Sequence, residues 1–190
     1  MKQAKVLTDK ELKRVIEYVD AVDRYAERNR AMILLTHYLG LRVSELANLR
    51  TDNVLNEHGE LNDVIYLNAE QTKGSKSRRV FVGKKAKAVL NRYFKHATNA
   101  SKRPYLFSTQ QSHKFNVNAL TQLFKRWYAR AGIVGATSHS GRRTWLTTLS
   151  QKGVSVFVLA DMAGHRSIQT TQRYVTVNDE MKRNAADLIS

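Results

Sequence analysis

The feature that most constrains the fold is a dense apolar segment, residues 26–39, followed by a glycine. Its second half, AMILLTHYLG (residues 31–40), has too many apolar side chains for a helix that keeps one face in water. Such a helix has to be covered by other elements on most of its circumference, so this segment predicts a central core helix. Gly40 is a typical C-terminal stop for it.

The segments around this core helix repeat their apolar residues at helical spacing. Thr8 and Glu11 fit a capping box, which predicts a first helix over residues 9–22. The same pattern predicts a short helix within GLRVSELANLR (residues 40–50) and one that Ser167 caps. Further helices are expected at residues 84–96, 117–131, 142–152, 154–162 and 179–189.

Between residues 53 and 82 the pattern changes to that of strands. VIYL (residues 64–67) and RRVFV (residues 78–82) are rich in β-branched and aromatic residues, and QTKGSKS between them is typical of a hairpin turn. A preceding strand is expected in VLNEHGEL (residues 54–61), with Gly59 at its turn. The expected fold class is α+β, mostly α-helical, with a small antiparallel β-sheet near the N-terminal third. With 190 residues and no internal repeat or long linker, residues 1–190 should form a single domain.

The charge balance indicates a polyanionic partner. Thirty-two Lys and Arg against sixteen Asp and Glu leave a formal net charge of +16, and nucleic acid is the commonest partner for such a chain. A ribosomal type of RNA binder and a membrane-surface protein are the alternatives. No apolar run approaches the roughly 18 residues of a membrane span, and no cysteine is available for disulfides or thiolate metal sites. We therefore expect a soluble, cytoplasmic protein without a membrane partner.

Several polar residues stand at the edges of the expected elements, and each is weak evidence alone. Arg42 has the pattern of a solvated helix residue, and Lys73 that of a basic hairpin that touches phosphates. His139 and Arg142 form an H-x-x-R pattern that occurs often by chance. Tyr174, nine residues after His165, is one of eight tyrosines. Only their combination carries a functional prediction.

That combination resembles the catalytic domain of the tyrosine recombinases, the phage integrase family. Four stretches match in the family's order and at similar intervals, from about Leu7 onward: GLRVSEL, TKGSKSRRVFV, HSGRRTWLTTL and LADMAGHRSIQTTQRYV. One departure is Gly141, where many relatives have leucine within H-x-L-R. Because the spacing of His139 and Arg142 is kept, Gly141 is interpreted as a variant of the motif.

The resemblance implies a nucleophile and a set of cations and imidazoles. Tyr174 would attack a DNA phosphate, form a 3′-phosphotyrosyl bond and release a 5′-hydroxyl. Arg42 and Arg142 would clamp the non-bridging oxygens, while His139 and His165 would add hydrogen bonds. Paired donors on planar guanidinium groups suit a phosphate whose negative charge is spread over its equatorial oxygens. No metal and no cofactor is expected, so these side chains would supply the positive charge.

The resemblance also implies a general acid and a supporting carboxylate. Lys73, on the expected hairpin, would protonate the leaving 5′-oxygen, a contribution worth on the order of 10² to 10⁴ in rate. Because the interval from Arg42 to Lys73 is somewhat long, Lys76 is the alternative acid. Glu45 matches a family glutamate that supports the site and does not itself react.

The implied partner is double-stranded DNA. The protein would be monomeric or weakly associating when free, and tetrameric on synapsed DNA. Residues 175–190 either pack on their own domain or are exchanged between protomers. Relatives usually carry an N-terminal helical domain, so this chain is either a minimal recombinase or a fragment. A type IB topoisomerase and a non-catalytic DNA-binding regulator remain the other functional classes.

Overall fold

The computed structural model describes residues 3–72, 77–97, 99–175, 177 and 179–187. Helices dominate, and two strands form an antiparallel sheet, so the predicted mostly helical α+β fold is confirmed. The helices and strands are α1 (Asp9–Val22), α2 (Ala26–Tyr38), α3 (Val43–Ala47), α4 (Thr51–Val54), β1 (Val64–Leu67), β2 (Arg78–Phe81), α5 (Lys84–His96), α6 (Val117–Arg130), α7 (Ser140–Gln151), α8 (Val156–Ala163), α9 (Ile168–Gln172) and α10 (Asp179–Asp187). Short 3₁₀ turns cover Ala69–Gln71 and Ala100–Lys102.

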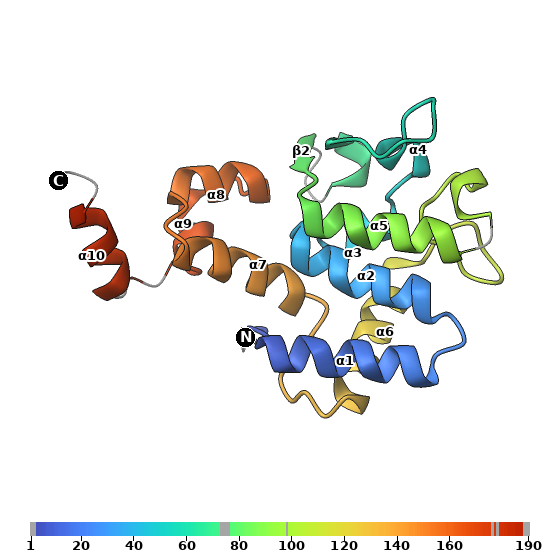
Figure 1. Cartoon of the computed structure of the whole chain (residues 1–190), viewed down its shortest axis with the longest axis horizontal. Helices are drawn as coiled ribbons and strands as arrows, with labels where there is room; N and C mark the ends of the chain where they lie inside the picture. The colour runs from blue at the N-terminus through green and yellow to red at the C-terminus, as the bar shows by residue number, and fades with distance from the viewer. Residues whose placement is uncertain (1–2, 73–76, 98, 176, 178, 188–190) are drawn as a thin grey trace.

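Helix α2 is the core helix that its composition predicts. Its residues from Ala31 to Thr36 are all buried, and α1, α5 and α7 pack against it (Figure 1). Gly40 follows the helix with a φ of +61°, and a Cβ built on it would lie 2.3 Å from Trp145 of α7. Only glycine fits there, because any side chain would push α7 away from the end of α2.

The sheet has two strands, and the third strand expected from residues 54–61 is wrong. Strands β1 and β2 pair antiparallel, with Val64 opposite Phe81 and Leu67 opposite Arg78. Within residues 54–61 an isolated bridge joins Leu55 and Leu61. The Asn56 side chain accepts hydrogen bonds from the backbone N–H groups of residues 58 and 60, which curls this segment into a turn too tight for a ladder.

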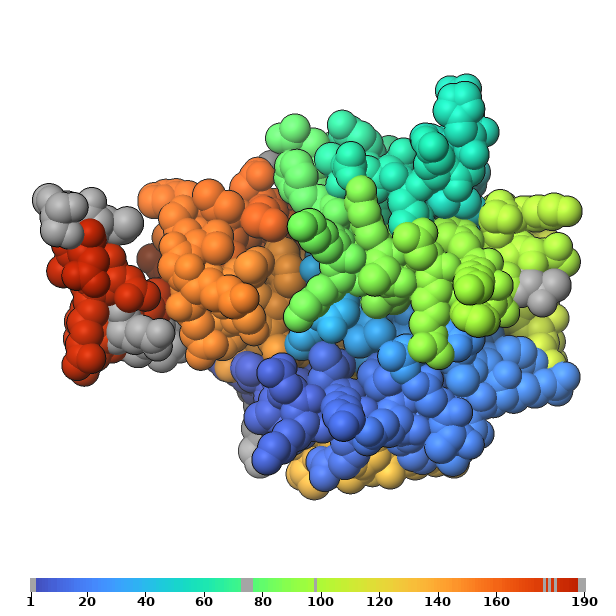
Figure 2. All heavy atoms as spheres, viewed as in Figure 1, coloured from blue at the N-terminus to red at the C-terminus, as the bar shows by residue number. Residues whose placement is uncertain are grey.

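The molecule has a large core and a small one. The large core lies between α1, α2, α3, α5, α6 and the sheet. In the small core, Leu146 of α7 meets Leu159 and Ala163 of α8, and Tyr174 packs against them. Figure 2 shows the α7–α9 region as a lobe at one end of the body. Because α7 packs on both α2 and α8, it joins the two parts.

Helix α10 stands beyond this lobe, away from the rest of the molecule (Figures 1 and 2). Its described side chains are exposed, except for the half-buried Met181. The predicted helix is confirmed over residues 179–187, whereas Leu188 and Ile189 of the same prediction lie outside the described residues. Within the described ranges, no helix combines the length and the apolar character that crossing a membrane requires.

Candidate active site

A buried carboxylate holds two arginines together at the start of α3. Arg42 is the residue before α3, and its backbone N–H and Nη1 both donate to the Glu45 carboxylate, at 2.7 and 2.8 Å. Arg78, the first residue of β2, donates to both oxygens of the same carboxylate, at 3.0 and 2.7 Å. Glu45 is completely buried. It therefore links the helix that carries Arg42 to the strand that carries Arg78.

The protonation state of Glu45 follows from these contacts. Burial would raise the pKa of its carboxyl, but the hydrogen bonds and charge of Arg78, the charge of Arg142 and the backbone N–H of Arg42 together lower the pKa below its ordinary value. Glu45 is thus an ionised support that orients two guanidinium groups, as the resemblance implies.

A third arginine, Arg142, lies in the first turn of α7 and is 6% exposed. Its Nη1 donates to the Gly40 carbonyl and its Nη2 to the Ala163 carbonyl, each at 2.6 Å. Helix α7 begins at Ser140, two residues earlier than expected, because the Ser140 hydroxyl accepts the Thr137 N–H at 2.9 Å and closes the turn that precedes it. The guanidinium of Arg142 thereby bridges the C-terminal ends of α2 and α8.

The C-terminal end of α8 collects all three arginines. Besides the Ala163 carbonyl, which Arg142 contacts, the Met162 carbonyl accepts from Arg78 at 2.6 Å and the Gly164 carbonyl from Arg42 at 3.1 Å. The last carbonyls of a helix have no partner within the helix and carry a partial negative charge, so they attract cations. Three guanidinium groups from distant parts of the chain are held around one helix end.

This crowding of positive charge changes the pKa of Arg142. Burial, followed by the charge of Arg42, lowers the pKa of the Arg142 guanidinium to about 9, although the charge of Glu45 acts in the opposite direction. A bound anion would relieve both the desolvation and the mutual repulsion of the arginines. The site is therefore suited to an anionic ligand.

His165 follows α8 and contacts the same cluster. Its Nε2 lies 3.1 Å from Nη2 of Arg142, and its Nδ1 lies 2.8 Å from the hydroxyl of the buried Thr171. Since a guanidinium only donates, these contacts assign Nε2 as acceptor and Nδ1–H as donor to Thr171. Burial, and then the charges of Arg142 and Arg42, lower the pKa of His165 to about 4. The imidazole is neutral at ordinary pH.

Tyr174 lies two residues after the end of α9, where the chain returns to the cluster. Its ring stacks on that of His165, with 6.1 Å between centroids and 22° between planes. The Arg143 guanidinium carbon lies 6.0 Å from the centroid of the same ring. Ser167 caps α9, as predicted, by accepting the N–H of Gln169. The side chain of Tyr174 is half-buried against the small core.

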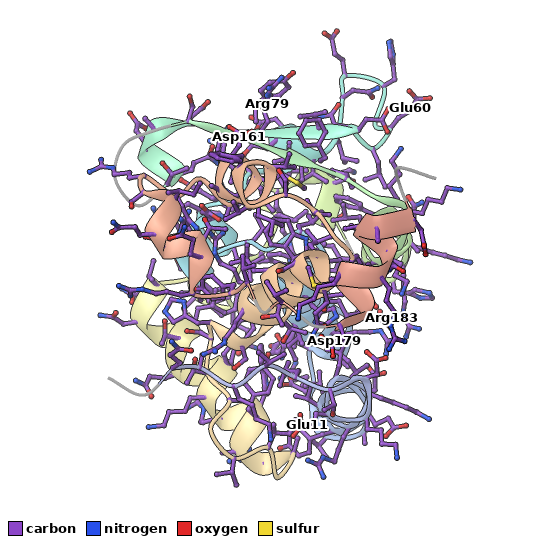
Figure 3. The ribbon with its side chains drawn as sticks, turned by 90° about the vertical axis from the view of Figure 1, so that its left-hand side faces the viewer. Glu11, Glu60, Arg79, Asp161, Asp179 and Arg183 are labelled. Atoms are coloured by element: carbon purple, nitrogen blue, oxygen red, sulfur yellow. The ribbon has the colours of Figure 1, made fainter. Side chains whose placement is uncertain are left out.

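A pocket of about 680 Å³ opens between the sheet and the end of α8. Figure 3 looks onto this end of the molecule and labels two of the lining residues, Arg79 of β2 and Asp161 of α8, near each other at the top of the view. Positively charged groups dominate the described lining, in which Asp161 is the single carboxylate. The lining residues are Arg42, Tyr66, Leu67, Asn68, Thr72, Ser77, Arg78, Arg79, Ala160, Asp161, Gly164, His165 and Arg166.

The other two predicted site residues are placed less fully. Thr72 and Ser77 line the pocket, while Lys73 and the alternative acid Lys76 lie outside the described residues. His139 is exposed at the N-cap of α7, one turn before Arg142, and is not among the described residues that line the pocket. The structure thus brings together Arg42, Arg142, His165 and Tyr174 of the six predicted residues.

Two residues of this cluster were not predicted. By sequence Arg78 is one more cation of the basic hairpin that carries Lys73, but it points inward to Glu45. The alternation of buried and exposed residues along β2 could have indicated this, because Arg78 lies on the same face as the buried Val80. Thr171, the partner of His165, carries no sequence signal beyond its place on the short helix that Ser167 caps. Among the described residues, no three His, Asp or Glu gather closely enough to hold a metal ion.

Comparison with known proteins gives the class of this site. The model of the phage integrase family matches residues 5–181, which is nearly the whole chain. The chain therefore belongs to the phage integrase family, whose members are the tyrosine recombinases.

Individual relatives agree with this assignment. Tyrosine recombinase XerA of Pyrococcus furiosus is 28% identical over 186 residues, which cover 96% of this chain and 61% of the relative. The crystal structure of XerA recombinase matches with a TM-score of 0.74 and 26% identity, over 99% of this chain and 64% of that one. The Tn1549 transposon integrase in complex with circular intermediate DNA shares the fold, with a TM-score of 0.74 at 19% identity over 100% of this chain and 68% of that one. The chain spans about three fifths of the length of its curated relatives.

Proposed function

We propose that this chain is the catalytic part of a site-specific DNA recombinase that cuts and rejoins strands through a 3′-phosphotyrosyl bond to Tyr174. The observation that carries the proposal is the gathering of Arg42, Arg142 and His165 at one end of α8, with the Tyr174 ring stacked on His165. Membership in the tyrosine recombinase family supports the same conclusion.

The cationic cluster explains why a phosphodiester is the substrate. Each guanidinium has five N–H donors, and the hydrogen bonds described above use only some of those of Arg42 and Arg142. The remaining donors can bind the non-bridging oxygens of a phosphate, where negative charge accumulates during transfer. Fixed donors in a partly buried site stabilise such charge without reorganising, which is a major source of catalysis. We propose that these side chains act without a metal ion.

The proposed reaction conserves atoms and charge. The phenolic oxygen of Tyr174 bonds to phosphorus and its proton passes to solvent water, while the bond from phosphorus to the 5′-oxygen breaks. That oxygen takes a proton from Lys73, or from Lys76 if the alignment is shifted, and leaves as a 5′-hydroxyl. Because the phosphotyrosyl bond keeps the energy of the backbone bond, a 5′-hydroxyl of another strand can reverse the step without ATP.

Thr171 gives His165 a role in this reaction. When a phosphate takes the donors of Arg142, Nε2 of His165 loses its partner and can hold a proton toward a phosphate oxygen. Its Nδ1 then becomes an acceptor, and the Thr171 hydroxyl, 2.8 Å away, can donate to it as readily as it can accept. We propose that His139, one turn before Arg142, adds a second hydrogen bond when DNA is bound.

We propose double-stranded DNA as the partner, and a tetramer on two synapsed sites as the working assembly, with monomers or weak associations in the free state. The formal net charge of +16 supports phosphate contacts well beyond the active site. The position of α10, apart from the body, supports its docking on a neighbouring protomer (Figure 1).

The decisive experiment is covalent capture of DNA. DNA that the chain binds would first be selected from a random library and then rebuilt with a nick beside the cleaved bond, so that the released fragment diffuses away. We expect an SDS-resistant adduct, its loss in Tyr174→Phe, and its retention in Tyr66→Phe, because Tyr66 lines the same pocket but lies on β1.

Other outcomes would contradict the proposal. An adduct that persists in Tyr174→Phe would mean that another residue is the nucleophile. No adduct on any selected DNA would favour a binding-only regulator. Relaxation of a plasmid with two target sites, without recombined products, would favour a topoisomerase.

A further inference from the structure

We infer that Arg143 is a positioning residue for Tyr174, and that the segment before α1 holds it in place. This inference rests on the proposed function, because it assigns Arg143 a part in making and breaking the phosphotyrosyl bond. Arg143 lies outside the H-x-x-R pattern formed by His139 and Arg142, although it directly follows Arg142.

The two consecutive arginines of α7 diverge, as neighbours on a helix do. Arg142 reaches inward to the Gly40 and Ala163 carbonyls. Arg143 instead donates from Nη1 to the Ala4 carbonyl at 2.8 Å, and its guanidinium carbon lies 6.0 Å from the centre of the Tyr174 ring. Arg142 thus belongs to the cationic cluster, and Arg143 contacts the proposed nucleophile.

The Ala4 carbonyl is held in place because two of the residues that follow it are hydrogen-bonded to the body. The Lys5 N–H donates to the Gly135 carbonyl at 3.1 Å, in the loop before α7. The Leu7 N–H donates to the buried hydroxyl of Thr144 at 2.8 Å, one residue beyond Arg143. Figure 1 shows this N-terminal end of the chain beside α7. The guanidinium of Arg143 is therefore hydrogen-bonded to a backbone group that Lys5 and Leu7 hold beside α7.

The charge of Arg143 is not compensated by any described carboxylate, since it forms no ion pair among the residues that the structure describes. Its Nε is buried and has no hydrogen-bond acceptor among the described residues. Among the polar side chains that the structure describes, the cation Arg142 and the neutral imidazole of His165 also lie near Tyr174. The half-buried guanidinium therefore places near the Tyr174 ring a positive charge that no described carboxylate neutralises.

This arrangement helps Tyr174 in both directions of the reaction. During cleavage the phenol loses its proton to water as its oxygen bonds to phosphorus, and during rejoining the same oxygen leaves with negative charge. A cation near the ring favours that charge and keeps the ring in place through its attraction to the π face. Arg143 needs no contact with DNA to have this effect.

The test compares a neutral and a charged replacement of Arg143 in the full chain. Arg143→Met keeps much of the side-chain length without the charge, Arg143→Lys keeps the charge, and Arg126→Met, on the exposed face of α6, controls for the loss of one cation. Removal of residues 1–4 takes away the Ala4 acceptor and leaves Arg143. The readouts are thermal unfolding, the Kd for selected DNA, and single-turnover rates of adduct formation and of rejoining.

We expect Arg143→Met to slow cleavage and rejoining alike by about tenfold, the scale of one partly desolvated cation–π contact, with the Kd and the thermal transition unchanged. Arg143→Lys should keep at least about a third of the rate, and the trimmed chain should lie between the two. Arg126→Met should cleave at the parent rate.

The outcomes separate this inference from the proposed function. If the parent chain forms no adduct that depends on Tyr174, the proposed function and the inference about Arg143 are both overturned. If the parent forms it and Arg143→Met does so at the parent rate, only the inference is overturned. Equal slowing in the Lys and Met variants would also overturn it, because the charge would then not matter. Full activity of the trimmed chain would refute the role of the N-terminal segment.

Discussion

At the scale of single residues, backbone carbonyls hold the arginines where a phosphate would later bind. The Gly40, Ala163 and Gly164 carbonyls occupy donors of Arg142 and Arg42. The guanidinium groups are therefore oriented before any phosphate binds, and little entropy would be lost on binding. The cost is a cluster of like charges, which lowers the affinity of nearby groups for protons.

His165 offers a test of that cluster through pH. Its pKa falls from the ordinary 6.5 to about 4 in the folded chain. Between these values the unfolded chain binds a proton that the folded chain does not, so the free energy of unfolding decreases as pH falls through this window. Because the side chain is only about half buried, we expect a loss on the order of 1 kcal/mol.

Urea unfolding between pH 7 and pH 4 would measure this effect. His165→Gln should show a shallower decline than the parent, whereas His58→Gln, in the exposed loop before β1, should follow the parent. A decline of equal slope in His165→Gln would mean that other groups cause the acid sensitivity and that the arginine cluster does not suppress protonation of His165.

The residues that the sequence predicted differ in kind from those that it missed. Arg42, Arg142, His165 and Tyr174 stand in recognisable motifs, so the resemblance could place them in one site. Arg78 acts through partners 33 and 84 positions away, and Arg143 through a carbonyl 139 positions away. Such contacts depend on how the elements pack, and a single sequence does not show that packing.

At the scale of elements, local signals predicted most of the boundaries. The capping box correctly places the start of α1 at Asp9. The helix predicted over residues 84–96 from its apolar periodicity has the same bounds as α5. The two errors have different causes. The Asn56 side chain accepts backbone hydrogen bonds and turns an expected strand into a loop, whereas α4 was missed because four residues are too few to show a helical period.

The crossing of α2 and α7 depends on Gly141. A Cβ at this position would lie 2.2 Å from the Thr36 hydroxyl and 3.1 Å from the Thr36 carbonyl carbon. The leucine of other family members does not fit this packing. We expect Gly141→Ala to lower the free energy of unfolding by about 1–3 kcal/mol, the usual cost of overpacking a core, and to displace Arg142 with the helix.

Two further variants test by urea unfolding whether contact with Thr36 causes the loss of stability in Gly141→Ala. Thr36→Ala removes the nearest atom, so the double variant should be more stable than the sum of the two single losses implies. Gly83→Ala, whose Cβ would meet nothing within 4 Å, should change stability by less than about 1 kcal/mol. Additive losses in the double variant would show that contact with Thr36 is not responsible.

At the scale of the whole molecule, the site lies where the large and small cores meet. Arg42 and Arg78 come from the body, whereas His165 and Tyr174 come from the α7–α9 lobe, and α7 carries Arg142 between them. The cluster is complete only when the lobe is docked on the body. Any partner that moves the lobe would change the distance between the cations and Tyr174, which fits the proposal that assembly on DNA controls cleavage.

Helix α10 is the element best placed to provide that control. Its described side chains are mostly exposed, so removal of residues 179–190 should lower the melting temperature by less than about 3 °C, which is about 1 kcal/mol for a chain of this size. Adduct formation at a single nicked site should persist. Pairing of two DNA sites, followed by native gel electrophoresis, should be lost, because each protomer would lack the helix that we propose docks on its neighbour.

The removed segment contains the cations Lys182 and Arg183, although its three carboxylates give it a formal net charge of −1. Lost docking therefore has to be separated from lost local contacts between these two cations and DNA. Lys182→Ala combined with Arg183→Ala keeps the helix and removes two exposed cations, and this variant should still pair two sites at low salt. Pairing that survives the truncation would contradict exchange of the tail between protomers. A drop of about 10 °C or more in melting temperature would instead show that α10 stabilises its own domain by several kcal/mol.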